Sequence, residues 1–133
     1  MDEERRAIVR ARLKKADTKL AAAEADLSAA RYDDAASRAY YAMFHAARAL
    51  LGARGLIARS HSGLAALFAE HFVRTGDLGI QFGRWLGQGR RAREIGDYDD
   101  FLELEAEETT QAVTRARQFL EEARRWLTAN GWT

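Results

Sequence analysis

Residues 34–51 read DAASRAYYAMFHAARALL, and the rest of the chain is best understood around this stretch. It contains no Gly, Pro, Val or Ile, and most positions are Ala, Leu, Met or aromatic, which strongly favours an α-helix. Its apolar side chains cover more than one helical row: Ala36, Tyr40, Met43, Ala47 and Leu50 form one row, and Phe44 and Leu51 widen it. We therefore expect a central helix that several neighbours contact.

One polar row remains on this helix. It consists of Asp34, Arg38, Tyr41, His45 and Arg48. Their spacing of four, three, four and three residues places all five side chains along one helical face. The row has three interpretations that the sequence leaves open: a solvated or dimer-forming face, a ligand-binding face, or a catalytic Arg38–His45 pair.

Length and composition restrict the class of protein. The 133 residues are enough for one domain, spanning residues 1–133, that buries a core. Twenty-one Lys and Arg oppose 20 Asp and Glu, so the net charge of +1 gives no global attraction to nucleic acid or membrane. The absence of Cys excludes disulfides and thiolate metal sites and fits a reducing cytoplasm. The absence of Pro, with abundant Ala, Leu, Arg and Glu, indicates an all-α fold.

Membrane and metal functions have no support in the sequence. Residues 1–10, MDEERRAIVR, lack the apolar region of a signal peptide, and no run approaches eighteen apolar residues. His45, His61 and His71 are the only histidines, and their spacing is not that of an HExxH-type site. We therefore expect no metal, no cofactor and no membrane, and a cytoplasmic protein.

The apolar periodicity predicts helices over about 3–29, 34–52, 62–74, 78–95 and 99–128. Asp33 or Asp34 is the expected N-cap of the second helix, and Ser60 that of the third. Gly96 and Asp97 are expected to end the fourth helix, and Phe101 and Leu104 to point inward from the fifth. Because the links are short, we expect an up-and-down four- to five-helix bundle.

Three segments carry a family resemblance: SRAYYAMFHAARALL (37–51), SHSGLAALFAEHFVRTG (60–76) and RRAREIGDYDD (90–100). Their order and spacing resemble the small prokaryotic HEPN-domain proteins, over roughly residues 15–125. The resemblance implies a helical bundle that often dimerises and that pairs with a minimal nucleotidyltransferase in two-gene toxin–antitoxin modules. Some members of the family have metal-independent RNase activity, so the resemblance also raises this activity as an expectation.

The RNase-type members carry an Arg followed, after four to six residues, by His. Arg38 and His45, separated by AYYAMF, satisfy this pattern. Guanidinium can hold a phosphate, and imidazole can move a proton near neutral pH. The family's active motif usually lies on a later helix, however, and here that position is held by Arg93-Glu-Ile-Gly-Asp97-Tyr98, which contains no His. This departure favours a structural or binding role for that element.

The candidate site residues form three groups. Arg38, His45 and Arg93 are the catalytic candidates, and Tyr41, Arg48, Arg90, Asp97 and Tyr98 are the candidates for binding a ligand or RNA. Ser60 and His61 are expected to form a structural cap at the start of the third helix. An Arg–Asp–Tyr cluster that fixes the turn before the fifth helix is the structural alternative for Arg93, Asp97 and Tyr98.

Two functions from different classes follow. The first is a homodimeric HEPN module that binds a minimal nucleotidyltransferase and also nucleotide or RNA. Residues 97–108 hold seven acids and no base after an arginine-rich stretch, and this polarity suits a protein partner at least as well as RNA. The second is a metal-independent endoribonuclease toxin that uses Arg38, His45, Arg93 and Tyr98. A bundle that only dimerises is the third alternative.

Overall fold

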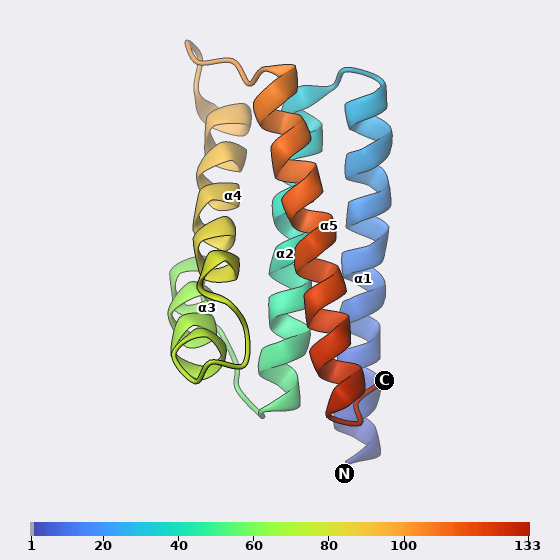
Figure 1. Ribbon diagram of the computed structural model, residues 1–133. Coiled ribbons are helices and arrows are strands. Elements are labelled where there is room, and N and C mark those ends of the chain that lie inside the picture. The colour runs from blue at the N-terminus through green and yellow to red at the C-terminus, as the bar shows by residue number, and fades with distance from the viewer. Residues whose placement is uncertain (1) are drawn as a thin grey trace.

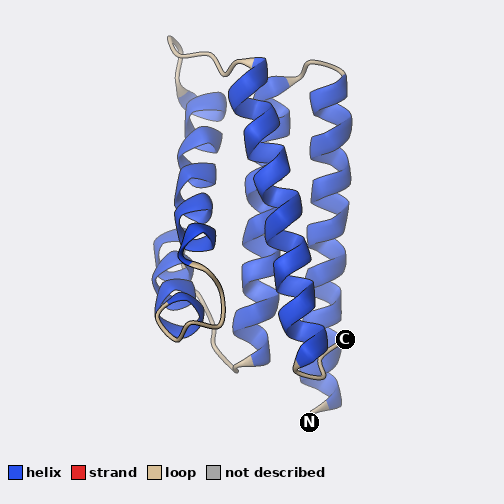
Figure 2. Ribbon diagram, viewed as in Figure 1, coloured by secondary structure: helices blue, strands red, loops and turns tan. Residues whose placement is uncertain are grey.

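The computed structural model describes residues 2–133. All regular secondary structure in this range is helical, as the sequence predicts. Figures 1 and 2 show a bundle in which α1 (Glu3–Ser28), α2 (Tyr32–Ala53), α4 (Ile80–Tyr98) and α5 (Ala106–Ala129) run side by side. The short α3 (His61–Phe68) continues directly into η1 (Ala69–Val73), a π-helical turn that the sequence did not reveal. No described helix is long and apolar enough to cross a membrane.

Helix α2 is the central element of the bundle. It packs against α1, α3, α4 and α5, and twelve of its 22 residues are buried. Eight of the buried residues are alanines, whose small side chains allow the neighbouring helices to approach closely. On α4, Gly89 lies over Met43, and a Cβ there would come within 2.5 Å of the Met43 methyl group. The prediction of a central helix over residues 34–51 is therefore confirmed.

The start of α2 differs from the expected capping. The chain turns through Ala30, whose φ is +60°, and the helix begins at Tyr32 with Arg31 at the N-cap position and no side-chain cap. Asp33 and Asp34 were expected to be the cap, but they lie inside the first helical turn. At this position their negative charges interact favourably with the positive end of the helix dipole. The left-handed residue shortens the turn, so the helix begins earlier than predicted.

The α4–α5 connection also differs from the prediction. Helix α4 continues through Gly96 and Asp97 to Tyr98, and α5 begins only at Ala106. Arg93 and Asp97 form an i,i+4 ion pair of 3.2 Å that supports the last turn of α4. Reciprocal hydrogen bonds between Glu105 and Glu108 form a capping box that starts α5. Residues 99–105 are therefore a loop.

Phe101 was expected to point inward, and it does not. It lies in this loop and is 94% exposed, so the prediction is wrong. Leu104, which was also expected inward, is buried and lies close to Gly96.

At the far end of the bundle, one arginine joins three elements. The Arg54 guanidinium lies over the rings of Phe72 and Trp126, 4.2 and 4.9 Å from their centroids. It also donates to Asp77 at 2.7 Å and to the carbonyl of His71. Because Arg54 holds the His71 carbonyl of the π-helical turn and packs on Phe72 and Trp126, it fixes η1 against α2 and α5.

Candidate functional site

The polar row of α2 lies on the side of the helix that its neighbours leave uncovered. Arg38, Tyr41, His45 and Arg48 are all partly exposed, whereas the opposite side of α2 is buried under α5. Phe44, which the sequence placed with the apolar side chains, is also only partly buried and joins this surface. The candidate residues of α2 are therefore accessible, but they do not all have the same surroundings.

Arg38 is committed to a contact within the chain. Its Nη1 donates to Asp26 Oδ2 of α1 at 2.6 Å, and Arg31 Nε donates to the other carboxylate oxygen at 2.9 Å. Asp26 is one of the few buried polar residues, at 6% exposure. Such a charge requires compensating partners, and Arg31 and Arg38 supply them. Asp26 was not among the candidates, although an acid in register with the apolar stripe of α1 was the available signal.

His45 lies among cations, without an acid beside it. Burial, and then the charges of Arg48, Lys15, Lys19 and Arg12, lower the pKa of His45 to about 4. Its Nδ1 atom is covered and has no hydrogen-bond partner among residues 2–133. The imidazole is therefore neutral near pH 7, and it lacks the acceptor that orients the ring of a general base.

Arg93 makes several contacts within the candidate site. Its side chain is 17% exposed, and its guanidinium lies 5.3 Å from the Tyr41 ring centroid and 5.5 Å from that of Tyr98. It donates to the Tyr98 hydroxyl at 3.3 Å and pairs with Asp97. The candidates Tyr41, Arg93, Asp97 and Tyr98 thus come together, whereas Arg90 pairs separately with Glu94 at 3.2 Å.

The start of α3 contributes Ser60 and His61 beside the residues of α2 and α4. Ser60 is the N-cap of α3 and accepts from the Gly63 N–H at 2.9 Å. The Tyr40 hydroxyl lies 2.6 Å from His61 Nδ1. Burial raises the pKa of Tyr40 to about 12, so this hydroxyl stays protonated and donates to the imidazole. Burial and the nearby Arg90 and Arg93 lower the pKa of His61, which keeps it in the acceptor form.

These contacts define one surface, which we name the aromatic–arginine face: Tyr41, Phe44, His45, Arg48, His61 and Arg93. Its rings are in mutual contact, with the His61 centroid 5.0 Å from Phe44 and 6.1 Å from Tyr41, and the His45 centroid 6.3 Å from Tyr41. Arg48 lies over Phe44 at 5.9 Å. The face combines side chains of α2, α3 and α4.

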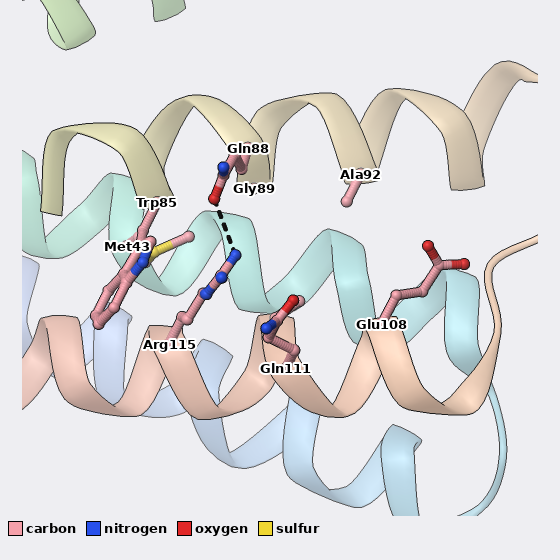
Figure 3. A pocket seen from close by; sticks show the side chains of 9 residues that line it. Met43, Trp85, Gln88, Gly89, Ala92, Glu108, Gln111 and Arg115 are labelled. Carbon is pink, nitrogen blue, oxygen red and sulfur yellow. Dashed lines mark hydrogen bonds between the residues drawn. The ribbon is translucent and has the colours of Figure 1, made fainter. Parts of the chain in front are cut away.

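A second concave region lies between α4 and α5 and is drawn in Figure 3. Its volume is about 150 Å³, and Arg115 of α5 reaches across it to Gln88 of α4 with a 2.9 Å hydrogen bond. Met43 and Trp85 form its apolar wall. The cleft is smaller than the usual range of about 300–1,000 Å³ for ligand pockets, and it contains none of the candidate residues.

No group of three or more His, Cys, Asp or Glu within residues 2–133 has the arrangement of a metal site.

Comparison with known protein families shows which family the chain belongs to. The model of the HEPN domain matches residues 9–126, which is most of its length. This chain belongs to the HEPN family. The resemblance seen in the three sequence segments is confirmed, and so is the helical bundle that it implied.

Several HEPN relatives share much of this chain. A protein of Methanocaldococcus jannaschii named "Putative toxin MJ0142" is 30% identical over 115 residues, which cover 86% of this chain and 78% of the relative. A second from that organism, named "Putative toxin MJ0605", is 34% identical over 112 residues, covering 79% and 83%. The "UPF0332 protein glr0978" of Gloeobacter violaceus is 43% identical over 84 residues, covering 63% and 67%. Two of the three relatives are thus named for toxicity.

Proposed function

We propose that this protein is the HEPN component of a toxin–antitoxin-like pair and that it acts by binding a protein partner through the aromatic–arginine face. The observation that carries the proposal is the clustering of the partly exposed Tyr41, Phe44 and His61 rings, with Arg93 lying over the Tyr41 ring. Aromatic residues and arginine dominate the energetics of protein interfaces. The toxin names of two relatives support a role in such a pair.

The partner in this proposal is a minimal nucleotidyltransferase, as the family resemblance implies. A protein fits the face better than RNA because Arg93, the arginine of α4 in this face, already pairs with Asp97, and the neighbouring Arg90 pairs with Glu94. Such pairs reduce the net positive charge that a phosphate backbone requires. Nucleotide or RNA binding is a secondary element of the proposal, and it would use Arg48. The pair would act in the cytoplasm.

Homodimerisation is the second element of the proposal. The apolar side chains of Ile57, Phe101 and Leu102 are exposed outside the aromatic–arginine face, and a second copy is the partner that is always available to them. Two identical chains pair most simply through a closed twofold interface.

The test is co-expression with the product of the neighbouring gene, followed by calorimetric titration of the purified proteins. Tyr41→Ala and Arg93→Ala should each weaken the complex at least about tenfold, which corresponds to about 1.4 kcal/mol. Arg84→Ala, an exposed arginine of α4 outside the face, is the matched control and should bind like the wild type. Absence of a complex, or equal affinity of all four proteins, would refute the proposed function.

One observation favours a second function, that of a metal-independent endoribonuclease. His45 is neutral at pH 7 and lies beside Arg48, so it has the protonation state of a general base next to a phosphate-binding cation. Against it, Arg38 is held by Asp26 and the later element contains no His.

Incubation with RNA in EDTA separates the two functions. An RNase would cleave, and His45→Ala and Arg93→Ala would lose that cleavage without unfolding. The binding proposal expects all three proteins to leave the RNA intact.

A further inference from the structure

The loop between α4 and α5 carries an apolar pair in an unusual position. Phe101 is 94% exposed, Leu102 is 58% exposed, and Tyr98 beside them is 69% exposed. The turn is held by Asp99 Oδ1, which accepts hydrogen bonds from the backbone N–H groups of Phe101 and Leu102, each at 2.8 Å. A fixed turn that holds two large apolar side chains in water indicates a contact with another molecule. We name residues 98–105 the acidic tip.

The charge around the tip identifies the kind of surface that it fits. Residues 97–108 hold seven acids and no base, a formal charge of −7, whereas the rest of the chain holds 21 bases and 13 acids and carries +8. The acidic segment repels phosphate, so nucleic acid is excluded as its ligand. It is attracted to a surface with unpaired cations around an apolar centre.

The same chain presents such a surface at the other half of the bundle. Arg12, Lys15 and Lys19 of α1 and Arg48 of α2 form what we name the cationic patch. None of the four makes an ion pair with any described residue. Their positive charges contribute to the lowered pKa of His45. Beside them lie Phe44 and the loop residues Leu56 and Ile57, the last 75% exposed. The patch therefore offers positive charge next to apolar side chains.

The acidic tip of a chain cannot reach its own cationic patch. The tip lies at the end of the bundle where α1 ends and α2 begins (Figure 1). Arg48 is sixteen residues beyond the start of α2 at Tyr32, which is about 24 Å along the helix axis. Both surfaces consequently remain uncovered in one chain, and each is available to a second copy.

We propose that the acidic tip of one copy docks on the cationic patch of a second copy, and that the two contacts are reciprocal. Phe101 would pack beside Leu56 and Ile57, while Asp100 and Glu103 would face Lys15 and Lys19. A reciprocal contact closes a twofold dimer, whereas a single contact repeated head to tail would form open chains. This inference rests on the homodimer of the proposed function and assigns the surfaces that form it.

A charge exchange tests the proposal. One variant carries Asp100→Lys and Glu103→Lys in the tip, and the other carries Lys15→Glu and Lys19→Glu in the patch. All four positions are exposed and make no other contact that holds the fold, and Asp99 is left intact because it fixes the turn. A control variant, Arg10→Glu with Lys14→Glu, makes the same change of charge on the opposite flank of α1.

Sedimentation velocity over a range of concentrations measures the dimer dissociation constant of each protein and of an equimolar mixture of the two variants. The dimer dissociation constant of each variant alone should be about a hundredfold higher than that of the wild type, because like charges then meet at both contacts. The mixture should recover dimers within about tenfold of the wild-type affinity, since both contacts again join opposite charges. The control should behave like the wild type, and Phe101→Ser should weaken the dimer at least about tenfold.

Two results would overturn the inference in different ways. A wild-type protein that stays monomeric at every concentration refutes both this interface and the proposed homodimer. A wild-type dimer that neither variant weakens, or that the mixture does not restore, refutes the tip–patch contact and leaves the homodimer with another interface.

Discussion

Arg38 and Arg48 lie on the same polar row of α2, but only Arg38 has a carboxylate partner. Arg38 faces the buried Asp26, which holds it in the corner between α1 and α2. Arg48 has no ion pair with any described residue, lies over Phe44 and shares its surroundings with Lys15 and Lys19. The difference shows that membership of a helical row places a side chain on a face without determining its role. The acid contributed by the neighbouring helix determines it.

The largest effect is expected at the corner of α1 and α2. Asp26→Ala removes the acid from Arg31 and Arg38 and should lower the free energy of unfolding by about 2 kcal/mol. This lies below the usual loss for a buried pair because the two arginine side chains are 55% and 42% exposed. Urea unfolding measures the change. The control is Asp17→Ala, which breaks the exposed pair with Arg124 and should cost about 0.5 kcal/mol. Equal losses would show that Asp26 is not the structural anchor.

Arg93→Ala should have the next largest effect. The side chain is packed between Tyr41 and Tyr98, so its removal loses both apolar contact and the cation–π interactions, and we expect a loss of about 1.5 kcal/mol. Arg48→Ala should cost about 0.5 kcal/mol at most, because its single ring contact is distant. Thermal and urea unfolding of both variants compare the two positions. A greater loss at Arg48 than at Arg93 would show that the contacts of Arg93 do not stabilise the fold more than the single ring contact of Arg48.

A further effect is a pH dependence at His45. The unfolded imidazole takes up a proton below about pH 6.5, while the folded one does so only near pH 4. The unfolded state therefore binds more protons between these values, and the free energy of unfolding falls as the pH falls from 6.5 to 4. The contribution should be about 1 kcal/mol, because solvent screens this partly exposed site. His45→Gln should flatten the profile over this window. An unchanged profile would mean that His45 titrates normally in the folded protein.

Much of the fold follows from local sequence. Long runs of Ala and Leu with a three–four rhythm predict the helices, and the absence of Pro leaves few places to interrupt them. The predictions that were wrong lie at helix ends, where glycine was given too much weight. Gly96 does not end α4, because the Arg93–Asp97 pair supports the final turn. The capping box at Glu105 then delays α5 and leaves Phe101 in a loop.

The candidate site was less predictable, for a physical reason. Asp97 follows Arg93 by four residues on one helix, so their spacing alone brings these two side chains together. The contacts of Arg38 and His45 depend on side chains of α1, and no spacing within α2 reveals Asp26, Lys15 or Lys19. Contacts between helices require knowledge of how the two helices are rotated against each other, which a single sequence does not contain.

The most direct test compares Arg38→Ala with Arg93→Ala in calorimetric titrations against the proposed nucleotidyltransferase partner. If the aromatic–arginine face binds the partner, Arg93→Ala loses at least about tenfold in affinity, while Arg38→Ala stays within about threefold of the wild type. The opposite order, with binding lost at Arg38 and kept at Arg93, would contradict the assignment of function to this face.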